Sequence, residues 1–474
     1  MPWLAFIFVS LLSWRPLQPP AHLPRYVFHV ELDYARHRLT AQAEVELANR
    51  WGQPLSELVF HVPPARLPGV FRLDTLTIDG GSQPPPHQLR DGFLTIYLPK
   101  PLSPGKRVAV FMAFALDLPP VQTGAGFVAS SLGWSEVALN AGHWHPVLAP
   151  YDPARGGWQT WAFSPIGDPY VTESADYEVS IVAPPGVVVA GGGEGLREGN
   201  AWRYRLPAGR EFAFVASDRW EEAKTELGGV QVHSYFLPEH REAGLAALQA
   251  AAEALQFYSD AFGPYPYRDF RIAETRADGG MEFPGFSYLT DVFYALWPGS
   301  ARSHLVYTVV HEVAHQWWYN LVGNDQVQEP WLDEALAEYC AWLFYRERLP
   351  DDAEWWWNFY VEERPLPDRP VNASIYQFND NTVYLLTVYR RGALLLADLE
   401  RQMGQRRLVA ALRTYLHRQA YRLATGADLL TALLRGTDRN LASLWSAYLT
   451  PIPWVPACAD RGERCFRSAA LQPR

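Results

Sequence analysis

Basic residues are scarce in this chain of 474 residues, and lysine is the scarcest of them. The chain holds 41 lysines and arginines against 51 aspartates and glutamates, which gives a formal net charge of −10. Lysine occurs at three positions, Lys100, Lys106 and Lys224. A protein with this balance lacks the basic surface that binds nucleic acid or an acidic membrane. We therefore expect neither as a partner.

Long apolar runs are also missing, and no stretch is long enough to cross a bilayer. The apolar run Trp3–Leu12 has the length of a signal-peptide core. No basic residue precedes this run, and no Ala-x-Ala cleavage site follows it. Residues 1–25 are therefore interpreted as a signal-like leader or as a start that has been truncated.

Cysteine occurs only three times. Cys458 and Cys465 flank a polar stretch near the end of the chain, and a disulfide between them would suit an oxidising compartment. Cys340 lies in an apolar helical pattern and is expected to be a small buried residue. With the leader, these residues favour an extracytoplasmic or secreted protein, with the cytoplasm as the alternative.

The remaining composition is that of a well-packed protein, with 48% hydrophobic and 14% aromatic residues. A chain of this length exceeds one ordinary core, so two or three domains are expected. Strand-like runs separated by proline and glycine predict an all-β domain over residues 26–220. Helical periodicity dominates residues 221–450 and predicts an α+β domain, followed by a proline-containing tail over residues 451–474.

The strongest chemical signal is the run His311-Glu312-Val313-Ala314-His315. Two residues four apart lie one turn above each other on a helix, so both imidazoles can bind one metal ion. Glu334 follows nineteen residues after the second histidine and supplies a carboxylate. Two nitrogen ligands and one carboxylate, with a fourth position open, are typical of a catalytic zinc site.

The surrounding residues place this motif on paired helices. Apolar residues recur at helical spacing from Val306 to Leu321, which predicts a buried amphipathic helix. Val322–Asp325 is interpreted as a turn, and Pro330 is expected near the start of a second helix that carries Glu334. Antiparallel helices of this kind would bring Glu334 back to the histidines. The alternative is two core helices with incidental polar residues.

Three ordered signatures in the sequence resemble the gluzincin aminopeptidases typified by aminopeptidase N. The first runs from His311 through Trp331-Leu332-Asp333-Glu334-Ala335, the second is Gly279-Gly280-Met281-Glu282, and the third is Tyr389-Arg390-Arg391-Gly392. The resemblance implies a multidomain protein, with a saddle-like β-sandwich before a thermolysin-like catalytic domain. It also implies a compact form without the large helical C-terminal domain of longer relatives.

The resemblance assigns a role to each residue of the signatures. His311, His315 and Glu334 would bind one Zn²⁺, with Glu312 as the general base and Tyr389 as the donor to the oxyanion. Glu282 would bind the free α-amine of the substrate, beside a peptide backbone paired with Gly279, Gly280 and Met281. From their own residues, Tyr389 can equally be a core tyrosine, and the two glycines a bulge or turn.

Four positions depart from the family pattern. Phe283 and Asp333 each replace an asparagine, Ala335 replaces a glycine, and Arg391 replaces a lysine. Phe283 leaves open how the substrate backbone is held. Relatives also contribute a glutamine or glutamate from the N-terminal domain to the amine pocket. That residue has no evident counterpart here, since the segment Trp144–Val147 differs from the family pattern.

Further polar residues carry weaker signals. Glu338 lies one helical turn beyond Glu334, where it can support a ligating histidine or be a solvated charge. Tyr384 is expected to line the cleft, and Asn324-Asp325 is interpreted as part of the turn between the metal-binding helices. The single histidines are interpreted as structural or surface residues; they are His143, His145, His233 and His304.

The sequence thus predicts a zinc aminopeptidase acting on peptides with a free N-terminus. A zinc endopeptidase or other zinc hydrolase is the first alternative, with Glu282 then only structural. A non-catalytic binding protein that keeps the fold is the second. The preferred N-terminal residue, the natural substrate and the oligomeric state are not predicted.

Overall fold

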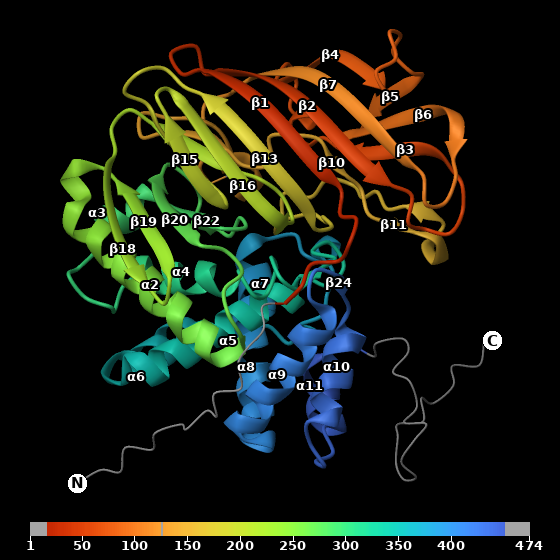
Figure 1. Cartoon of the computed structure of the whole chain (residues 1–474). Coiled ribbons are helices and arrows are strands. Elements are labelled where there is room, and N and C mark those ends of the chain that lie inside the picture. The colour runs from red at the N-terminus through yellow and green to blue at the C-terminus, as the bar shows by residue number, and fades with distance from the viewer. Residues whose placement is uncertain (1–16, 125–126, 451–474) are drawn as a thin grey trace.

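The first half of the chain builds sheets, and the second half builds helices over a smaller sheet (Figure 1). This arrangement is seen in a computed structural model that describes residues 17–124 and 127–450. The last strand of the N-terminal part ends at Ser217, and the first strand of the second part begins at Glu221. The predicted division at residue 220 falls in this connection.

The largest sheet of the described residues has seven strands. In spatial order they are β15 (Glu194–Glu198), β16 (Ala201–Gly209), β13 (Ala175–Val182), β1 (Arg25–Asp33), β2 (Arg38–Ala48), β7 (Arg107–Asp117) and β4 (Phe71–Ile78). Buried and exposed side chains alternate along β2, because successive residues of a strand face opposite sides of the sheet. The buried face supplies much of the N-terminal core.

Smaller sheets complete this N-terminal part. One contains β10 (Val147–Leu148), β3 (Leu55–His61), β6 (Phe93–Leu102) and β5 (His87–Arg90). Another contains β14 (Val188–Gly191), β17 (Phe214–Ser217), β9 (Leu139–Ala141) and β8 (Leu132–Trp134). The short elements are β11 (Tyr151–Asp152), β12 (Gly157–Trp158), α1 (Phe127–Ser130) and the 3₁₀ turns Pro63–Arg66 and Pro153–Arg155. The prediction of a β domain is thus confirmed.

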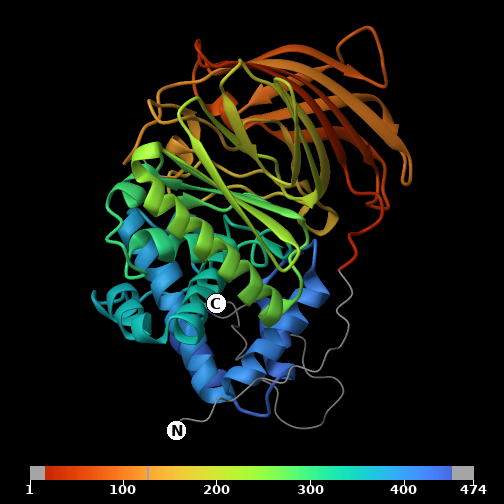
Figure 2. The same ribbon diagram turned by 60° about the vertical axis from the view of Figure 1, so that its left-hand side comes forward.

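A five-stranded sheet opens the second part. Its order is β18 (Glu221–Leu227), β19 (Val230–Phe236), β20 (Asp269–Thr275), β22 (Phe286–Thr290) and β21 (Gly280–Met281). The helix α2 (Arg241–Phe262) follows the 3₁₀ turn Pro238–His240 and packs along this sheet (Figures 1 and 2). Strand β21 lies at the end of the order, so one of its edges is free to pair with an extended peptide.

Helices form the rest of the second part. They are α3 (Asp291–Ala295), α4 (His304–Ala314), α5 (Trp331–Arg348), α6 (Pro350–Trp357), α7 (Asn381–Leu385), α8 (Arg391–Met403), α9 (Gln405–Gln419), α10 (Gly426–Arg435) and α11 (Ala442–Tyr448). π-helical turns cover Asn358–Glu362 and Leu386–Arg390, and a 3₁₀ turn covers Ile375–Gln377. In none of these described elements is a helix both long enough and apolar enough to cross a membrane.

The structure corrects two details of the metal-binding helices. The first helix ends at Ala314 and not near Leu321, and the backbone bonds that follow join Gln316 to Val313 and Trp317 to Ala314 as turns. The indole of Trp317 donates to the carbonyl of Gly263 at 2.9 Å. Within the predicted Val322–Asp325 turn, Gly323–Asn324 forms β23, which pairs with β24 (Leu423–Ala424). Tertiary contacts outweigh the helical spacing here.

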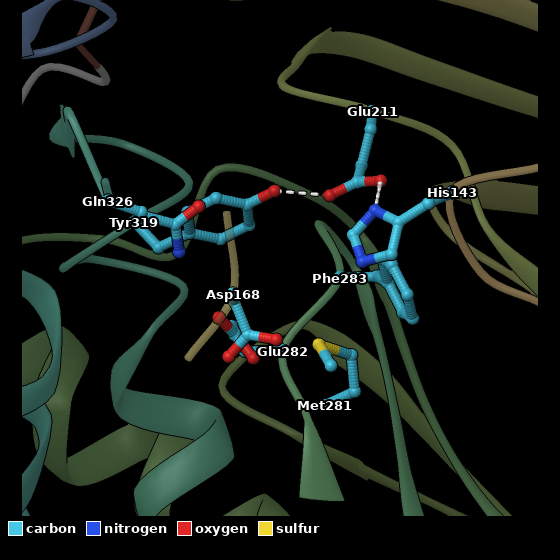
Figure 3. A pocket seen from close by; sticks show the side chains of 8 residues that line it. All are labelled: His143, Asp168, Glu211, Met281, Glu282, Phe283, Tyr319 and Gln326. Carbon is cyan, nitrogen blue, oxygen red and sulfur yellow. Dashed lines mark hydrogen bonds and ion pairs between the residues drawn. The ribbon is translucent and has the colours of Figure 1, made fainter. Parts of the chain in front are cut away.

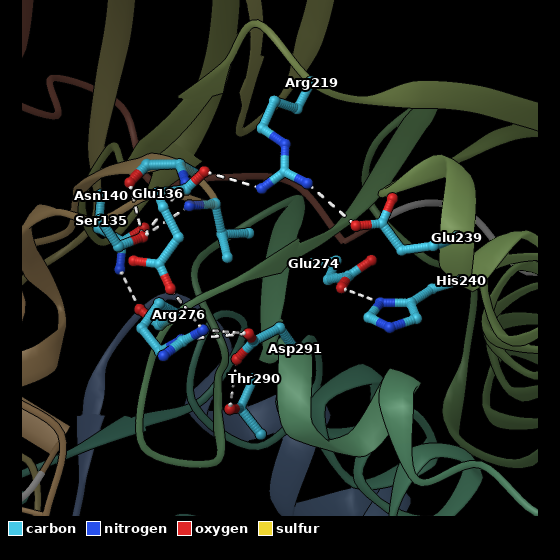
Figure 4. Close-up of polar contacts among 12 residues, drawn as sticks. Ser135, Glu136, Asn140, Arg219, Glu239, His240, Glu274, Arg276, Thr290 and Asp291 are labelled. Carbon is cyan, nitrogen blue, oxygen red and sulfur yellow. Dashed lines mark hydrogen bonds and ion pairs between the residues drawn. The ribbon is translucent and has the colours of Figure 1, made fainter.

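Charged side chains join the two parts of the chain (Figure 4). Arg276, directly after β20, pairs at 2.8 Å with both Glu136 of the β8–β9 connection and Asp291. Arg219 pairs with Glu239 at 3.0 Å and donates to the backbone carbonyl of Glu136 at 3.0 Å. Such partly exposed pairs contribute about 0–1 kcal/mol each. Buried packing therefore provides most of the free energy that holds the two parts together.

Two predictions fall outside the described residues. The apolar leader run Trp3–Leu12 is one, and the disulfide between Cys458 and Cys465 is the other. Cys340 lies within the described part and is buried with a free thiol, as expected. Export from the cytoplasm therefore stays a prediction.

Candidate metal centre and active site

The three predicted metal ligands meet in one place. The Nε2 atoms of His311 and His315 lie 3.1 Å apart, and Glu334 Oε2 lies 3.3 and 3.4 Å from them. A tetrahedral zinc ion with bonds of 2.0–2.1 Å separates its ligands by about 3.3 Å. Helix α4 supplies His311, its C-cap residue is His315, and α5 supplies Glu334. The spacing therefore fits one zinc ion.

The outer nitrogens of the two imidazoles support the same conclusion. His311 Nδ1 donates to Glu338 Oε2 at 3.0 Å, and His315 Nδ1 donates to the carbonyl of Trp318 at 3.0 Å. When both imidazoles are neutral, as metal binding requires, each Nε2 carries a lone pair and the two lone pairs face each other. Such an arrangement is repulsive unless a cation lies between them. Of the two readings of Glu338, the geometry favours support of a ligating histidine.

Glu312 lies beside these ligands. Its Oε2 atom is buried and has no hydrogen-bond partner within residues 17–124 and 127–450. Burial and then the charge of Glu282 raise the pKa of Glu312 to about 8. A Cβ atom at position 280 would collide with the Glu312 carboxylate, so only glycine lets β21 pass this close. Gly280 thus has a steric role at the site.

Tyr389 reaches the centre from the π-helical turn before α8. Its ring stacks on the His311 ring with centroids 5.7 Å apart and planes 12° apart, and Tyr384 packs edge-on against it at 5.8 Å. Burial and then the charge of Glu334 raise the pKa of Tyr389 well above its usual value. The hydroxyl therefore keeps its proton at neutral pH and can donate it in a hydrogen bond.

Glu282 and Asp168 form a carboxylate pair on one side of the ligands. Their oxygens and an oxygen of Glu334 all lie within 4.8 Å of one another. Both side chains are buried, and Asp168 Oδ1 has no hydrogen-bond partner in the described part of the chain. Burial raises the pKa of both groups. The charge of Glu282 raises the pKa of Asp168 further, whereas His315 partly offsets the effect of burial on Glu282 and Glu334 adds to it. A cation placed between them would relieve this repulsion.

Asp168 was missed by the sequence analysis, which identified no N-terminal partner for the amine pocket. It lies in the connection between β12 and β13, outside any strand or helix. Gly167 before it has a φ of +63°, and a Cβ there would meet the Tyr384 hydroxyl. The Gly167-Asp168-Pro169 run has the composition of a simple turn, so no local signal identifies it.

The segment directly after β21, which carries Glu282, is fixed to the segment that follows α4. The side-chain amide of Gln316 donates to the carbonyl of Phe283 at 3.1 Å and accepts from the backbone N–H of Gly285 at 2.9 Å. The Phe283 ring is buried, and it packs against His143 of the N-terminal part with centroids 5.2 Å apart. The residue that replaces the family asparagine therefore packs between the two parts of the chain.

Both interpretations of the glycine pair have structural support. Gly279 has a φ of +76°, which suits a turn, and its carbonyl accepts from Thr290 N at 2.8 Å. Gly280 and Met281 form the edge strand β21, and the Met281 side chain is buried. One glycine makes the turn, and the other allows the close approach to Glu312.

A narrow, closely packed pocket lies next to the carboxylate pair (Figure 3). Its lining residues are His143, Asp168, Glu211, Met281, Glu282, Phe283, Tyr319 and Gln326. His143 Nδ1 donates to Glu211 at 2.7 Å, and His143 Nε2 is buried without a partner among the described residues. His143 therefore lies at the candidate site, contrary to its structural interpretation.

The other single histidines are structural. His145 is buried among aromatic rings, and its Nδ1 contacts the carbonyl of Pro146. His304 accepts from the Tyr360 hydroxyl at 2.8 Å, and His233 pairs with Glu222 at 2.7 Å.

The second part of the chain is similar in sequence to known proteins. Residues 246–448 match the family model described as the peptidase family M1 domain. The chain is 27% identical over 255 residues to the alanine/arginine aminopeptidase of Saccharomyces cerevisiae, covering 50% of this chain and 29% of that protein. It is 25% identical over 257 residues to aminopeptidase N of Lactococcus lactis, covering 50% and 30%. The matches thus span less than a third of these relatives.

A solved structure supports the fold over almost the whole chain. The M1 zinc metallopeptidase from Deinococcus radiodurans superposes with a TM-score of 0.61 at 18% sequence identity. The match covers 93% of this chain and 97% of that chain. At this identity the likeness establishes the shared fold, in which an N-terminal sheet domain precedes a helical domain.

Proposed function

Residues 246–448 belong to peptidase family M1, and on that premise we propose that this chain is a zinc-dependent aminopeptidase that removes residues from the free N-terminus of peptides. One observation carries the proposal beyond a general zinc hydrolase. The buried carboxylates of Glu282 and Asp168, one from each part of the chain, lie together next to the metal ligands. A buried ammonium group requires such a partner.

His311, His315 and Glu334 would hold the zinc ion, since their donor atoms have the spacing and tautomers described above. Zinc bound there supplies Lewis acidity, which polarises the scissile carbonyl and acidifies a water molecule. The positive charge of a zinc ion beside Glu312 would favour its ionised form, and Glu312 would then accept a proton from water and pass it to the leaving amine. Its partner-free oxygen and its position beside Gly280 support this role.

Tyr389 would stabilise the negative charge that develops on the carbonyl oxygen. Its proton is retained because burial and Glu334 raise its pKa, and one such donor is worth about 3–4 kcal/mol. The substrate backbone would lie along the free edge of β21, held in place through Gln316. Glu282 and Asp168 then bind the ammonium group and set the scissile bond one residue from the N-terminus.

Hydrolysis of aminoacyl fluorogenic amides tests the proposal. We expect turnover with the zinc-loaded protein, loss of turnover with a chelator, and recovery when one equivalent of zinc is restored. A zinc-loaded, folded protein that cleaves none of a broad panel of aminoacyl amides would overturn the aminopeptidase assignment. Cleavage of internal bonds with the N-terminus blocked would instead favour the endopeptidase.

A further inference from the structure

Arg210, in the connection between β16 and β17, is a buried cation held by backbone carbonyls. Its guanidinium donates to the carbonyls of Thr172 at 2.8 Å, Arg422 at 2.9 Å and Tyr319. No carboxylate is among its hydrogen-bond partners in the described residues. Burial lowers the pKa of Arg210 to about 10, so it stays charged at neutral pH. A buried charge without an anionic partner is costly in free energy. This cost indicates that the hydrogen bonds of Arg210 serve a structural or functional role.

The next residue, Glu211, binds the other end of the same tyrosine. The Tyr319 hydroxyl donates to Glu211 Oε1, and His143 Nδ1 donates to Glu211 Oε2 (Figure 3). Burial alone would raise the pKa of Glu211, but the charge and hydrogen bond of His143 and the Tyr319 hydroxyl keep it below its usual value. The carboxylate is thus ionised and accepts strongly. Two adjacent N-terminal residues hold Tyr319 at its carbonyl and at its hydroxyl.

The backbone of Tyr319 is strained, and the hydrogen bonds from Arg210 and to Glu211 can maintain that strained conformation. Its φ is 154°, a conformation that side-chain-bearing residues rarely adopt and that costs about 1–3 kcal/mol. Rotation about φ turns the planar peptide group that carries the carbonyl of the preceding residue. That residue is Trp318, whose carbonyl accepts the Nδ1 proton of His315 at 3.0 Å. The conformation of Tyr319 therefore aims the carbonyl that orients His315.

The two ligating histidines are supported from different parts of the chain. His311 is oriented by Glu338, which lies on α5 within the second part. His315 is oriented by Trp318, whose peptide group is fixed through Tyr319 by residues of the N-terminal part. Partners of this kind set the tautomer and ring orientation of a metal ligand.

We propose that Arg210 and Glu211 are positioning residues, which hold Tyr319 at both ends and thereby fix His315 for metal binding. The N-terminal part would then contribute to zinc affinity without supplying a ligand. This inference rests on the proposed zinc site and is independent of which bond the enzyme cleaves.

The substitution Tyr319→Phe tests the inference on the full chain. It removes the hydroxyl held by Glu211 and keeps the ring, so the fold should survive. Loss of an orienting contact typically weakens metal binding about 10–100-fold, and we expect about tenfold here, measured by competition with a chelator. The matched control is Tyr204→Phe, which removes another buried N-terminal hydroxyl, bonded to the Val189 carbonyl at 2.7 Å. It should leave zinc affinity unchanged.

Cobalt substitution supplies a readout that general destabilisation would not move. The visible absorption of bound Co²⁺ depends on the ligand geometry, so it should shift in Tyr319→Phe and in Glu211→Gln but not in Tyr204→Phe. Unchanged zinc affinity and an unchanged cobalt spectrum in both site variants would overturn the inference. If the unaltered protein bound no zinc, the proposed function itself would fail.

Discussion

The second part of the chain and the N-terminal part contribute to the same site by different routes. The second part would supply the proposed metal ligands, Glu312 and Tyr389 from its helices and turns. The N-terminal part supplies single side chains from connections between strands, namely Asp168 and the pair Arg210 and Glu211. The comparison teaches that the chemistry lies in one part, whereas recognition and positioning depend on contact between both.

The largest expected effect tests the proton-transfer step, which depends on the second part of the chain alone. Glu312→Gln removes the group that accepts the proton, so turnover should fall about 10²–10⁴-fold. Zinc content should stay at one ion per chain, because none of the three ligands changes. Steady-state kinetics and elemental analysis of the same preparation check this, and activity close to that of the unaltered protein would exclude Glu312 as the base.

Tyr389→Phe should have the next largest effect. Loss of one donor to a developing oxyanion lowers kcat about 10²–10³-fold, and KM should change little because the substrate carbonyl is bound mainly in the transition state. Tyr384→Phe, which alters the neighbouring buried tyrosine, is the matched control and should have a smaller effect on kcat. A rise in KM with kcat unchanged after Tyr389→Phe would contradict the assigned role.

Asp168→Asn tests the contribution of the N-terminal part to recognition. Removing one charged partner of a buried ammonium costs about 1.5–3 kcal/mol, so kcat/KM for free peptides should fall about 10–100-fold. Zinc affinity should be kept. Asp117→Asn, at an exposed position at the end of β7, should have no effect. If Asp168→Asn matched the unaltered enzyme, the amine pocket would consist of Glu282 alone.

The smallest effect concerns stability at the junction of the two parts. Glu274 on β20 accepts from Leu237 N at 2.8 Å and from His240, and burial raises its pKa to about 7 (Figure 4). The folded protein therefore holds a proton that the unfolded chain releases above about pH 4.5. The stabilisation of the folded protein by protonated Glu274 is fully present below pH 4.5 and is lost as the pH rises through 7.

Glu274→Gln removes this titration. Between pH 4.5 and 7 the free energy of unfolding should therefore fall less in the variant than in the unaltered protein. The difference should be about 1–3 kcal/mol, measured by denaturant unfolding across that range. Glu239→Gln, which alters a half-exposed carboxylate nearby, serves as the control. Identical pH profiles for Glu274→Gln and the unaltered protein would mean that Glu274 ionises normally.

The sequence predicts the site residues of the second part of the chain better than those of the N-terminal part. The ligands and Glu312 are readable because helical geometry places residues four apart on one face, and the five-residue motif is local. Tyr389, Glu282 and the two glycines are assigned by resemblance, and the structure brings Tyr389, Glu282 and Gly280 close to the ligands or Glu312.

The residues that could not be predicted depend on tertiary contact. Asp168 has the local pattern of a turn residue, and only the packing of the two parts places it beside Glu282. The end of α4 at Ala314 and the conformation of Tyr319 were missed for the same reason. Both segments make contacts with residues distant in sequence, such as Gly263 and Arg210, and helical periodicity does not reveal such contacts.

The central claim is that recognition of a free amine turns this zinc site into an aminopeptidase. The most direct test compares kcat/KM of the zinc-loaded protein for one peptide with a free N-terminus and for the same peptide N-acetylated. We predict that acetylation, which removes the positive charge bound by Glu282 and Asp168, lowers kcat/KM at least about 100-fold. Equal cleavage of the two peptides would contradict the account.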